Sequence, residues 1–525
     1  MKFTELYGDK IFGAICGFDR VRFRGTIRWI ANDQGIRCFL RKQKVLLKNF
    51  TSWAQSKTCF VRKCAAERAE ELDIPMLYLN SGAVNKEELA RKVAAERGVR
   101  KDGSICMFSV VEPCWSPSVV GNRETKQLEI RMRSRRCIWL YHYWDDPFLG
   151  FGHVRLQTWL PMTAQICLNG RHWLEKQLLA NNIAYVKDGN CFPWIEDVEA
   201  AQGLLDEQLR TNWPQLLDHL TERLLPQFHS VFDPLDLQHY WSADETEFAT
   251  DVMFKSAKNL DRLFPALLQY GMKVSDSPAV MRYLGRRKPE QSGMGSGQVP
   301  KEIRSDVRKF YEGLRIKHTI NANSVKSYNK SGSVLRVETT INNTRDYKVF
   351  RCPDDDESKP PSWQKLRKGV CDLHRRAEVS RQCNDRYIEA VCATQVEEKL
   401  QEAIGGPCQP IRRKNGQSHR ALNPWNDEDF KLLAFLVKGE HHLNGFRNRD
   451  LRQYLNPTSE DQHPTIRRRL SGKATRKIRL LRAHGLIRKA PKVNRYVLTQ
   501  KGRKFSLALM LASAVETKQL IESAA

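Results

Sequence analysis

The fold of the C-terminal part of the chain is decided by one stretch, which reads KATRKIRLLRAHGLIRK from residue 473 to residue 489. Its apolar residues Ala474, Ile478 and Leu481 recur at helical spacing. Gly485 is a residue type that commonly ends a helix. The pattern therefore predicts a helix from the start of the stretch to His484, with its lysines and arginines turned outward.

Two further helices are predicted before this one, and two short strands after it. The apolar residues between 430 and 437 predict the first helix, and residues 446–455 predict the second. Residues 486–499 predict two strands joined by a proline-containing turn. This order of elements is that of a winged helix-turn-helix, which we expect over residues 411–525.

Positive charge is concentrated in the same region. Residues 411–505 contain 24 Lys and Arg against 7 Asp and Glu, which accounts for most of the net charge of +27 of the whole chain. DNA is the expected partner, because DNA affinity rests largely on neutralising phosphates. The alternative is a basic surface on a module that binds only protein. The residues expected to contact DNA here are Arg447, Arg449, Lys473, Arg476, Lys477, Arg479, Lys492 and Arg495.

Residues 478–489 and 495–503 resemble the recognition helix and wing of MarR-like regulators. The resemblance covers only the C-terminal domain, and it implies a winged helix that binds DNA. The sequence departs from that family in a proline-containing insert, residues 456–470, which carries three consecutive arginines. The chain as a whole also resembles bacterial proteins of similar length, and this resemblance implies no activity.

Composition limits the class of protein. A chain of 525 residues with 41% hydrophobic residues is long enough for several domains with buried cores. Runs of eighteen apolar residues are absent from the sequence, so no membrane span and no membrane partner are expected. The N-terminal residues lack the apolar core of a signal peptide, which predicts a cytoplasmic, nucleoid-associated protein. The fourteen cysteines include no Cys-x-x-Cys pair, so no structural zinc is expected.

The fold class predicted from these patterns is α+β and multidomain. The expected parts are a mixed α/β domain over residues 1–225, a helical segment over 226–285, a linker or mobile loop over 286–300, an antiparallel β-rich basic segment over 301–352 and a helical connector over 353–410.

The central segment offers a first candidate for catalysis. Residues 314–320, 324–328 and 334–342 alternate like three antiparallel strands. Tyr328 would serve as the nucleophile of a DNA-nicking enzyme, and Glu338 would hold Mg²⁺ or Mn²⁺. The residues expected to contact nucleic acid here are Arg315, Lys317, Lys326, Lys330 and Arg336.

The same segment resembles the strand–Tyr–x–Lys–strand–Arg–x–Glu pattern of rolling-circle replication initiators. Asn329 stands where that pattern has Asp, and the His-hydrophobic-His metal motif of those proteins is missing. The alternative is a phosphate-contacting sheet with a buried pair of Arg336 and Glu338.

Carboxylates in the N-terminal region form a second candidate. Asp19 lies in a predicted strand beside alternating arginines, and Asp145 lies at the end of another strand. Acidic residues at strand ends form the two-metal sites of nucleases, so Asp19 and Asp145 are candidate catalytic and metal-binding residues. The alternatives are a phosphate-binding face around Asp19 and ordinary turn chemistry at Asp145.

A third candidate lies between Trp241 and Phe254, where a helix is predicted. Glu247 and Asp251 would share one face of that helix at i, i+4. This arrangement suits metal binding, and we expect it to serve salt bridges to the basic surface instead.

Two functions from different classes follow. The first is a DNA-binding replication initiator or transposase-like nuclease of a mobile genetic element, with metal-dependent nicking or strand transfer. The second is a non-enzymatic protein that binds DNA or RNA, as a transcriptional regulator or a ribonucleoprotein component. A cluster of three carboxylates within metal-bridging distance would favour the enzyme, and sheets with only basic and aromatic faces would favour the binding protein.

Overall fold

The fold is α+β, as predicted, and is organised around one large sheet. The computed structural model describes residues 3–512 except 234, 236, 286–302, 311–312, 354–358, 392–404, 413–415, 439–440, 442–444, 457–463 and 492. The expected linker over residues 286–300 and the predicted DNA contact Lys492 therefore lie outside the described residues. The helices that are described include none long and apolar enough to cross a membrane.

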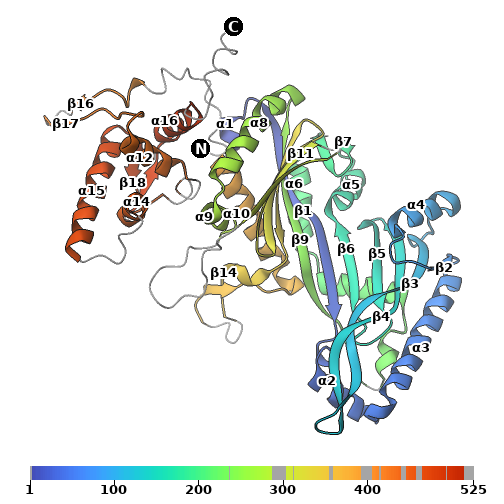
Figure 1. Ribbon diagram of the computed structural model, residues 1–525. Coiled ribbons are helices and arrows are strands. Elements are labelled where there is room, and N and C mark those ends of the chain that lie inside the picture. Colours follow the sequence, from blue (N-terminus) through green and yellow to red (C-terminus); the bar gives the residue numbers. More distant parts are fainter. Residues whose placement is uncertain are drawn as a thin grey trace. The chain divides into compact units, whose positions relative to one another are not determined.

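The large sheet has eleven strands in the order β10-β11-β12-β13-β9-β1-β6-β5-β4-β3-β2 (Figure 1). β2 pairs with β3 in parallel, and the neighbouring pair β3 and β4 is antiparallel. The strands are β1 (Ile11–Thr26), β2 (Met76–Leu79), β3 (Ser104–Asn122), β4 (Gln127–Asp146), β5 (Gly150–Gln157), β6 (Ala164–Asn169), β9 (Tyr240–Phe254), β10 (Arg304–Phe310), β11 (Gly313–Ile320), β12 (Asn323–Lys330) and β13 (Val334–Ile341).

The chain divides into two compact units. One contains residues 1–12, 252–337 and 382–525, and the other contains residues 13–251 and 338–381. Each unit therefore combines segments that are far apart in the sequence. The helices of the second unit include α2 (Asp33–Lys42), α3 (Phe50–Glu71), α4 (Lys86–Arg97), α5 (Gly170–Ala180), α6 (Val198–Gln208) and α7 (Trp213–Leu224).

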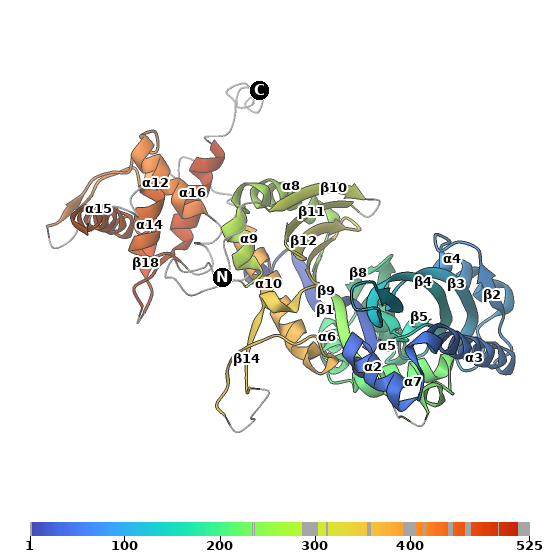
Figure 2. The same ribbon diagram turned by 60° about the horizontal axis from the view of Figure 1, so that its bottom comes forward.

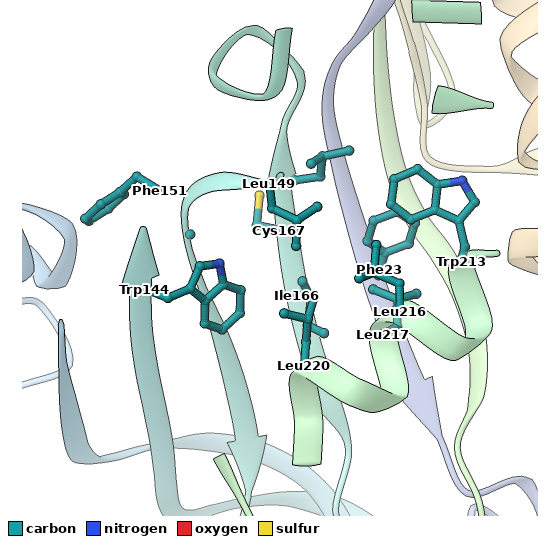
Figure 3. A pocket seen from close by; sticks show the side chains of 12 residues that line it. Phe23, Trp144, Leu149, Phe151, Ile166, Cys167, Trp213, Leu216, Leu217 and Leu220 are labelled. Carbon is teal, nitrogen blue, oxygen red and sulfur yellow. The ribbon is translucent and has the colours of Figure 1, made fainter. Parts of the chain in front are cut away.

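Helices of the second unit pack closely on β1. A side chain at Gly17 would collide with Leu205 of α6, and one at Gly170 would come within 1.6 Å of the carbonyl oxygen of Phe18. Phe23 lies 5.0 Å from Trp213 of α7, ring centre to ring centre. The pocket beside α7 in Figure 3 is lined mainly by apolar side chains and has a volume of about 10 Å³, room for one water molecule at most. It is a gap in the core packing and has no room for a ligand.

One predicted element is wrong, and it lies at the centre of the sheet. Residues 241–254 were expected to be helical, and they form strand β9. The strand is supported on both sides by other strands, and this long-range pairing overrides the local preference for a helix.

The C-terminal part of the first unit contains the predicted order of helices and strands (Figure 2). Its elements are α12 (Asp427–Val437), α14 (Asn448–Leu455), α15 (Pro464–Ala483), β18 (Ile487–Lys489), β19 (Tyr496–Leu498) and α16 (Gln500–Ala512). They enclose a hydrophobic core of their own, to which Leu433, Leu451 and Leu481 contribute. Gly485 has a φ of 71°, which ends α15 as expected.

Helix α15 begins nine residues earlier than predicted. It starts at Pro464 rather than near residue 473, so the second half of the insert belongs to the helix. Proline is well suited to a first helical position. The three arginines at 467–469 therefore lie in the first turns of α15.

Candidate metal centre

Three carboxylates from three neighbouring strands lie together in the second unit. Asp19 of β1, Glu247 of β9 and Glu338 of β13 each offer an oxygen, and these oxygens lie within 4.8 Å of one another. The three strands are adjacent in the order β13-β9-β1, and adjacent strands lie about 4.8 Å apart. The sheet therefore brings together residues that are between 91 and 319 positions apart in the sequence.

Asp19 is buried and held by hydrogen bonds from outside its own strand. The side-chain amide of Asn190 donates to both carboxylate oxygens, over 3.1 and 3.0 Å. Asn190 lies in the turn between β7 (Tyr185–Asp188) and β8 (Cys191–Ile195). These contacts fix the orientation of the Asp19 carboxylate and leave it 6% exposed.

Arg171 is a buried cation close to Asp19. Its side chain is fully buried, with Nη2 2.9 Å from Asp251 and Nε 3.8 Å from Asp19. Among the described residues, neither its Nε nor its Nη1 has a hydrogen-bond partner. Asn169 caps α5, and the contact between Gly170 and β1 places the start of this helix beside Asp19. Arg171 thus bridges β1 and β9 under the cluster.

Glu247 faces the more exposed side of the cluster. Arg20 Nε lies 3.3 Å from Glu247, and Arg20 Nη2 lies 2.7 Å from Glu245. Burial alone would lower the pKa of Arg20, and the two carboxylates outweigh burial and raise it. Arg22 and Arg24 continue this ladder of ion pairs to β9, with Glu245 and Asp244 respectively. The alternating arginines of β1 therefore pair with carboxylates of β9, and Glu247 forms the kind of salt bridge that was expected of it.

The arrangement has the dimensions of a site for a hard divalent cation. Oxygen ligands of Mg²⁺ lie about 2.1 Å from the ion, so two ligands of one ion are at most about 4.2 Å apart. Neighbouring ligands of an octahedral ion lie about 3.0 Å apart, so the three oxygens would move closer together when an ion binds. Carboxylates suit Mg²⁺ and Mn²⁺, and a bound cation would offset the mutual repulsion of three close carboxylates.

The structure brings two of the predicted metal ligands into this cluster and leaves one outside it. Asp19 and Glu338 are members, whereas Asp145 is not. Asp145 lies at the end of β4 and pairs with Lys176 of α5 over 3.1 Å. The neighbouring Asp146 caps the turn to β5 and pairs with Arg223. These two aspartates thus have the turn and ion-pair role that was the alternative to metal binding.

Glu247 was not among the expected ligands, although its spacing to Asp251 had been noted. Residues at i and i+4 share one face in a strand as well as in a helix, because strand side chains alternate with a period of two. A usable signal in the sequence was the alternation of apolar Trp241 and Ala243 with polar Ser242 and Asp244, and the two apolar residues are buried in β9.

The central basic residues do not form the exposed phosphate-contacting face that was expected. Lys326, Lys330 and Arg336 are 6%, 5% and 0% exposed. In a strand covered on both faces, alternation does not separate an inner from an outer surface. These three long side chains are therefore inaccessible to a nucleic-acid backbone in this structure.

The other residues of the central sheet lie in the first unit. Tyr328 is half-buried opposite Arg315, with Lys330 Nζ 5.4 Å from its ring centre. Arg315 pairs with Asp306 over 3.2 Å. Burial, and next the charge of Lys326, lowers the pKa of Lys317. Tyr328 is not a member of the carboxylate cluster, so its role as a nucleophile stays a prediction.

The predicted DNA contacts of α15 fall into two groups. Lys473, Arg476 and Arg479 are exposed. Lys477 is different, because its ammonium group pairs with Glu428 of α12 over 2.9 Å. Near the wing, Arg449 is exposed, and Arg447 and Arg495 are half-buried. Burial, and next the charge of Arg447, lowers the pKa of Arg495.

Comparison of the chain with protein-family models, with curated proteins and with solved structures gave no match.

Proposed function

We propose that the protein is a metal-dependent enzyme that cleaves DNA. Asp19, Glu247 and Glu338 would hold Mg²⁺ or Mn²⁺, and the C-terminal winged helix would bind the DNA. The observation that carries the proposal is the proximity of three carboxylate oxygens on three adjacent strands. Nicking or strand transfer by a replication initiator or transposase-like nuclease of a mobile element is the reaction class that this combination suits best.

The bound cation would supply two things, an activated water and charge neutralisation at the scissile phosphate. In hydrolysis the water oxygen forms a bond to phosphorus, and the bond from phosphorus to the leaving oxygen breaks. The proton of the water is released to solvent, and the leaving oxygen takes up a proton. Because Tyr328 is not a member of the cluster, we propose attack by water rather than by tyrosine.

The test is cleavage of supercoiled and single-stranded DNA in the presence of Mg²⁺ or Mn²⁺. Replacing any of Asp19 by Asn, Glu247 by Gln or Glu338 by Gln should slow cleavage by about 100-fold or more, because a metal ion supplies several kcal/mol of transition-state stabilisation. The matched control is Glu245→Gln, which removes a carboxylate that pairs with the same arginine as Glu247 and lies outside the cluster.

Two results would contradict the proposal. One is cleavage that persists in all three cluster variants. The other is a covalent protein–DNA adduct that disappears with Tyr328→Phe, which would assign the chemistry to the tyrosine.

A non-enzymatic protein that binds DNA or RNA is the second candidate. The burial of the cluster favours it, because Glu338 is 2% exposed and Arg171 is fully buried, as in a structural ion-pair network. Absence of cleavage on every DNA and RNA substrate, with salt-dependent binding retained, would favour this candidate.

A further inference from the structure

The hairpin of β3 and β4 extends beyond the strands on either side of it. The two strands pair with each other from Ser104 to Asn122. β2 pairs with β3 only as far as Val110, and β5 pairs with β4 only from Trp139 onward. In the described residues, the outer half of the hairpin, residues 111–138, is therefore a two-stranded ribbon with no third strand. We call this part the arm.

The arm is long enough to reach a ligand well outside the sheet. Its strands continue for about twelve residues past their last neighbour, which is about 41 Å at 3.4 Å per residue. Figure 1 shows the arm running to its turn at the lower end of the view, next to α2. α2 packs against β4, and α3 packs against β3.

The arm carries an excess of positive charge. Residues 111–138 include six Lys and Arg against three Glu. Arg131, Arg133 and Arg136 are exposed. Arg131 pairs with Glu129 of its own strand, and Arg136 donates to the carbonyl oxygen of Val111. A basic surface of this kind attracts an anionic polymer rather than an apolar partner.

A large aromatic side chain lies on this basic ribbon without cover. Trp115 is 62% exposed and stands directly opposite Ser134. Arg136 is the diagonal neighbour of Trp115 on the same face, about 7–8 Å away, which is within reach of a long side chain. Arg135 on the other face packs over the ring of Trp159, 4.8 Å from its centre. An exposed indole next to an arginine is an arrangement on which a base stacks while a neighbouring phosphate is neutralised.

We propose that the arm binds single-stranded nucleic acid, with one base stacked on Trp115 and a neighbouring phosphate bound by Arg136, which lies on the same face of the ribbon. A single strand is the specific ligand because the face of a base is accessible only when the base is unpaired. The inference deepens the proposed function, on which it rests for its substrate, by adding a surface that holds an unpaired strand of that substrate.

The test uses the full chain and measures its affinity for a labelled oligothymidylate and for a blunt duplex of the same length. Trp115→Ala should weaken binding of the single strand by roughly 5- to 150-fold, the range of one lost stacking contact. Trp115→Phe should retain most of the affinity because it keeps an aromatic ring. Tyr78→Ala, at a comparably exposed aromatic residue of β2, should have no effect.

The contribution of positive charge on the arm to binding is measured from the dependence of the affinity on salt concentration. For the single strand, Arg136→Gln should reduce the slope of log K against log salt by about 0.7, the value for one lost phosphate contact. Arg62→Gln on the exposed side of α3 is the control and should leave the slope unchanged.

The possible outcomes distinguish a failure of this inference from a failure of the proposed function. Unchanged single-strand affinity in Trp115→Ala, or an equal loss for single strand and duplex, would overturn stacking on the arm. Loss of cleavage in the cluster variants together with unaltered binding in the arm variants would overturn this inference alone. Trp115-dependent binding by a protein that cleaves no DNA would overturn the proposed function and leave the arm as a binding site.

Discussion

At the scale of single residues, Arg171 determines how the carboxylate cluster is held. It is fully buried between Asp19 and Asp251, and Asp251 is itself 1% exposed. Arg171→Leu would leave a buried carboxylate without this cation, which costs about 3–5 kcal/mol of stability in comparable pairs. We expect a marked loss of stability in urea unfolding of the full chain.

The control for this prediction is a pair on the surface. Arg91→Ala removes an exposed ion pair with Glu87 and should cost less than about 1 kcal/mol. Equal effects of the two substitutions would show that Arg171 has no special structural role.

His142 provides a prediction about pH. It is fully buried against the hydroxyl of Ser104, 3.0 Å away. Burial, and next the charge of Arg223, lowers the pKa of His142 to about 3, compared with about 6.5 in an unfolded chain. Between pH 3 and pH 6.5, His142 is protonated in the unfolded chain and neutral in the folded one. Its contribution to the free energy of unfolding is therefore fully present above pH 6.5 and is lost as the pH falls toward 3.

The measurement is the free energy of unfolding as a function of pH for the wild type and for His142→Gln. The difference between the two should change by about 1.4 kcal/mol per pH unit between roughly pH 4 and pH 6, in the direction of a less stable wild type at low pH. Parallel curves would contradict a neutral buried His142.

The residue scale also shows what the sequence could and could not predict. Asp19 and Glu338 were identified as candidates because each is a lone carboxylate in a basic strand pattern. Asp145 looked equally suitable, and only its contact with Lys176 shows its different role. The fold decides whether a carboxylate lies near a cation from a distant helix. This proximity cannot be predicted from the local sequence.

At the scale of elements, the winged-helix region gives a prediction about α15. Arg476 and Arg479 are exposed on this helix, and Lys477 is tied to α12 through Glu428. Arg476→Ala and Arg479→Ala in the full chain should each weaken duplex binding, by roughly 1–3 kcal/mol where a base contact is lost. Lys477→Ala should have a smaller effect on affinity.

Two measurements test the role of α15. Affinity for duplex DNA is compared across the variants at fixed salt, with Lys431→Ala as a control of equal charge change on the exposed side of α12. If Lys431→Ala weakens binding as much as Arg476→Ala, the contribution is general charge rather than docking of α15.

Elements with a strong periodic pattern were predicted well. The helix expected over residues 446–455 matches α14 (Asn448–Leu455). The sequence pattern predicted the wrong secondary structure for β9, where pairing with other strands determines the conformation. β9 was missed because its acidic residues disfavour a strand locally, and their pairing with the arginines of β1 becomes visible only in the sheet.

At the scale of the whole molecule, the strand order is what creates the candidate metal centre. β13, β9 and β1 are neighbours although they lie far apart in the chain. This adjacency could not be predicted, because a connection that returns to the sheet after a long excursion leaves no mark in the local sequence. The three carboxylates are present in the sequence, but only the strand order shows that they lie close together.

The metal centre makes a prediction about stability that is independent of any substrate. A cation that binds only the folded protein stabilises it by about 2.7 kcal/mol when its concentration is 100 times the dissociation constant. Millimolar Mn²⁺ should therefore raise the melting temperature of the wild type by several degrees, and excess EDTA should reverse the rise. Glu247→Gln should lose this response because it removes one of three ligands, whereas Glu245→Gln should keep it.

An equal response in the wild type and both variants would place any bound cation elsewhere. No response in the wild type would mean that the three carboxylates are held together by the protein's own cations, since Arg20 and Arg171 already pair with Glu247 and Asp19. In that case the burial of the cluster would be explained by ion pairing alone, and the non-enzymatic function would be preferred.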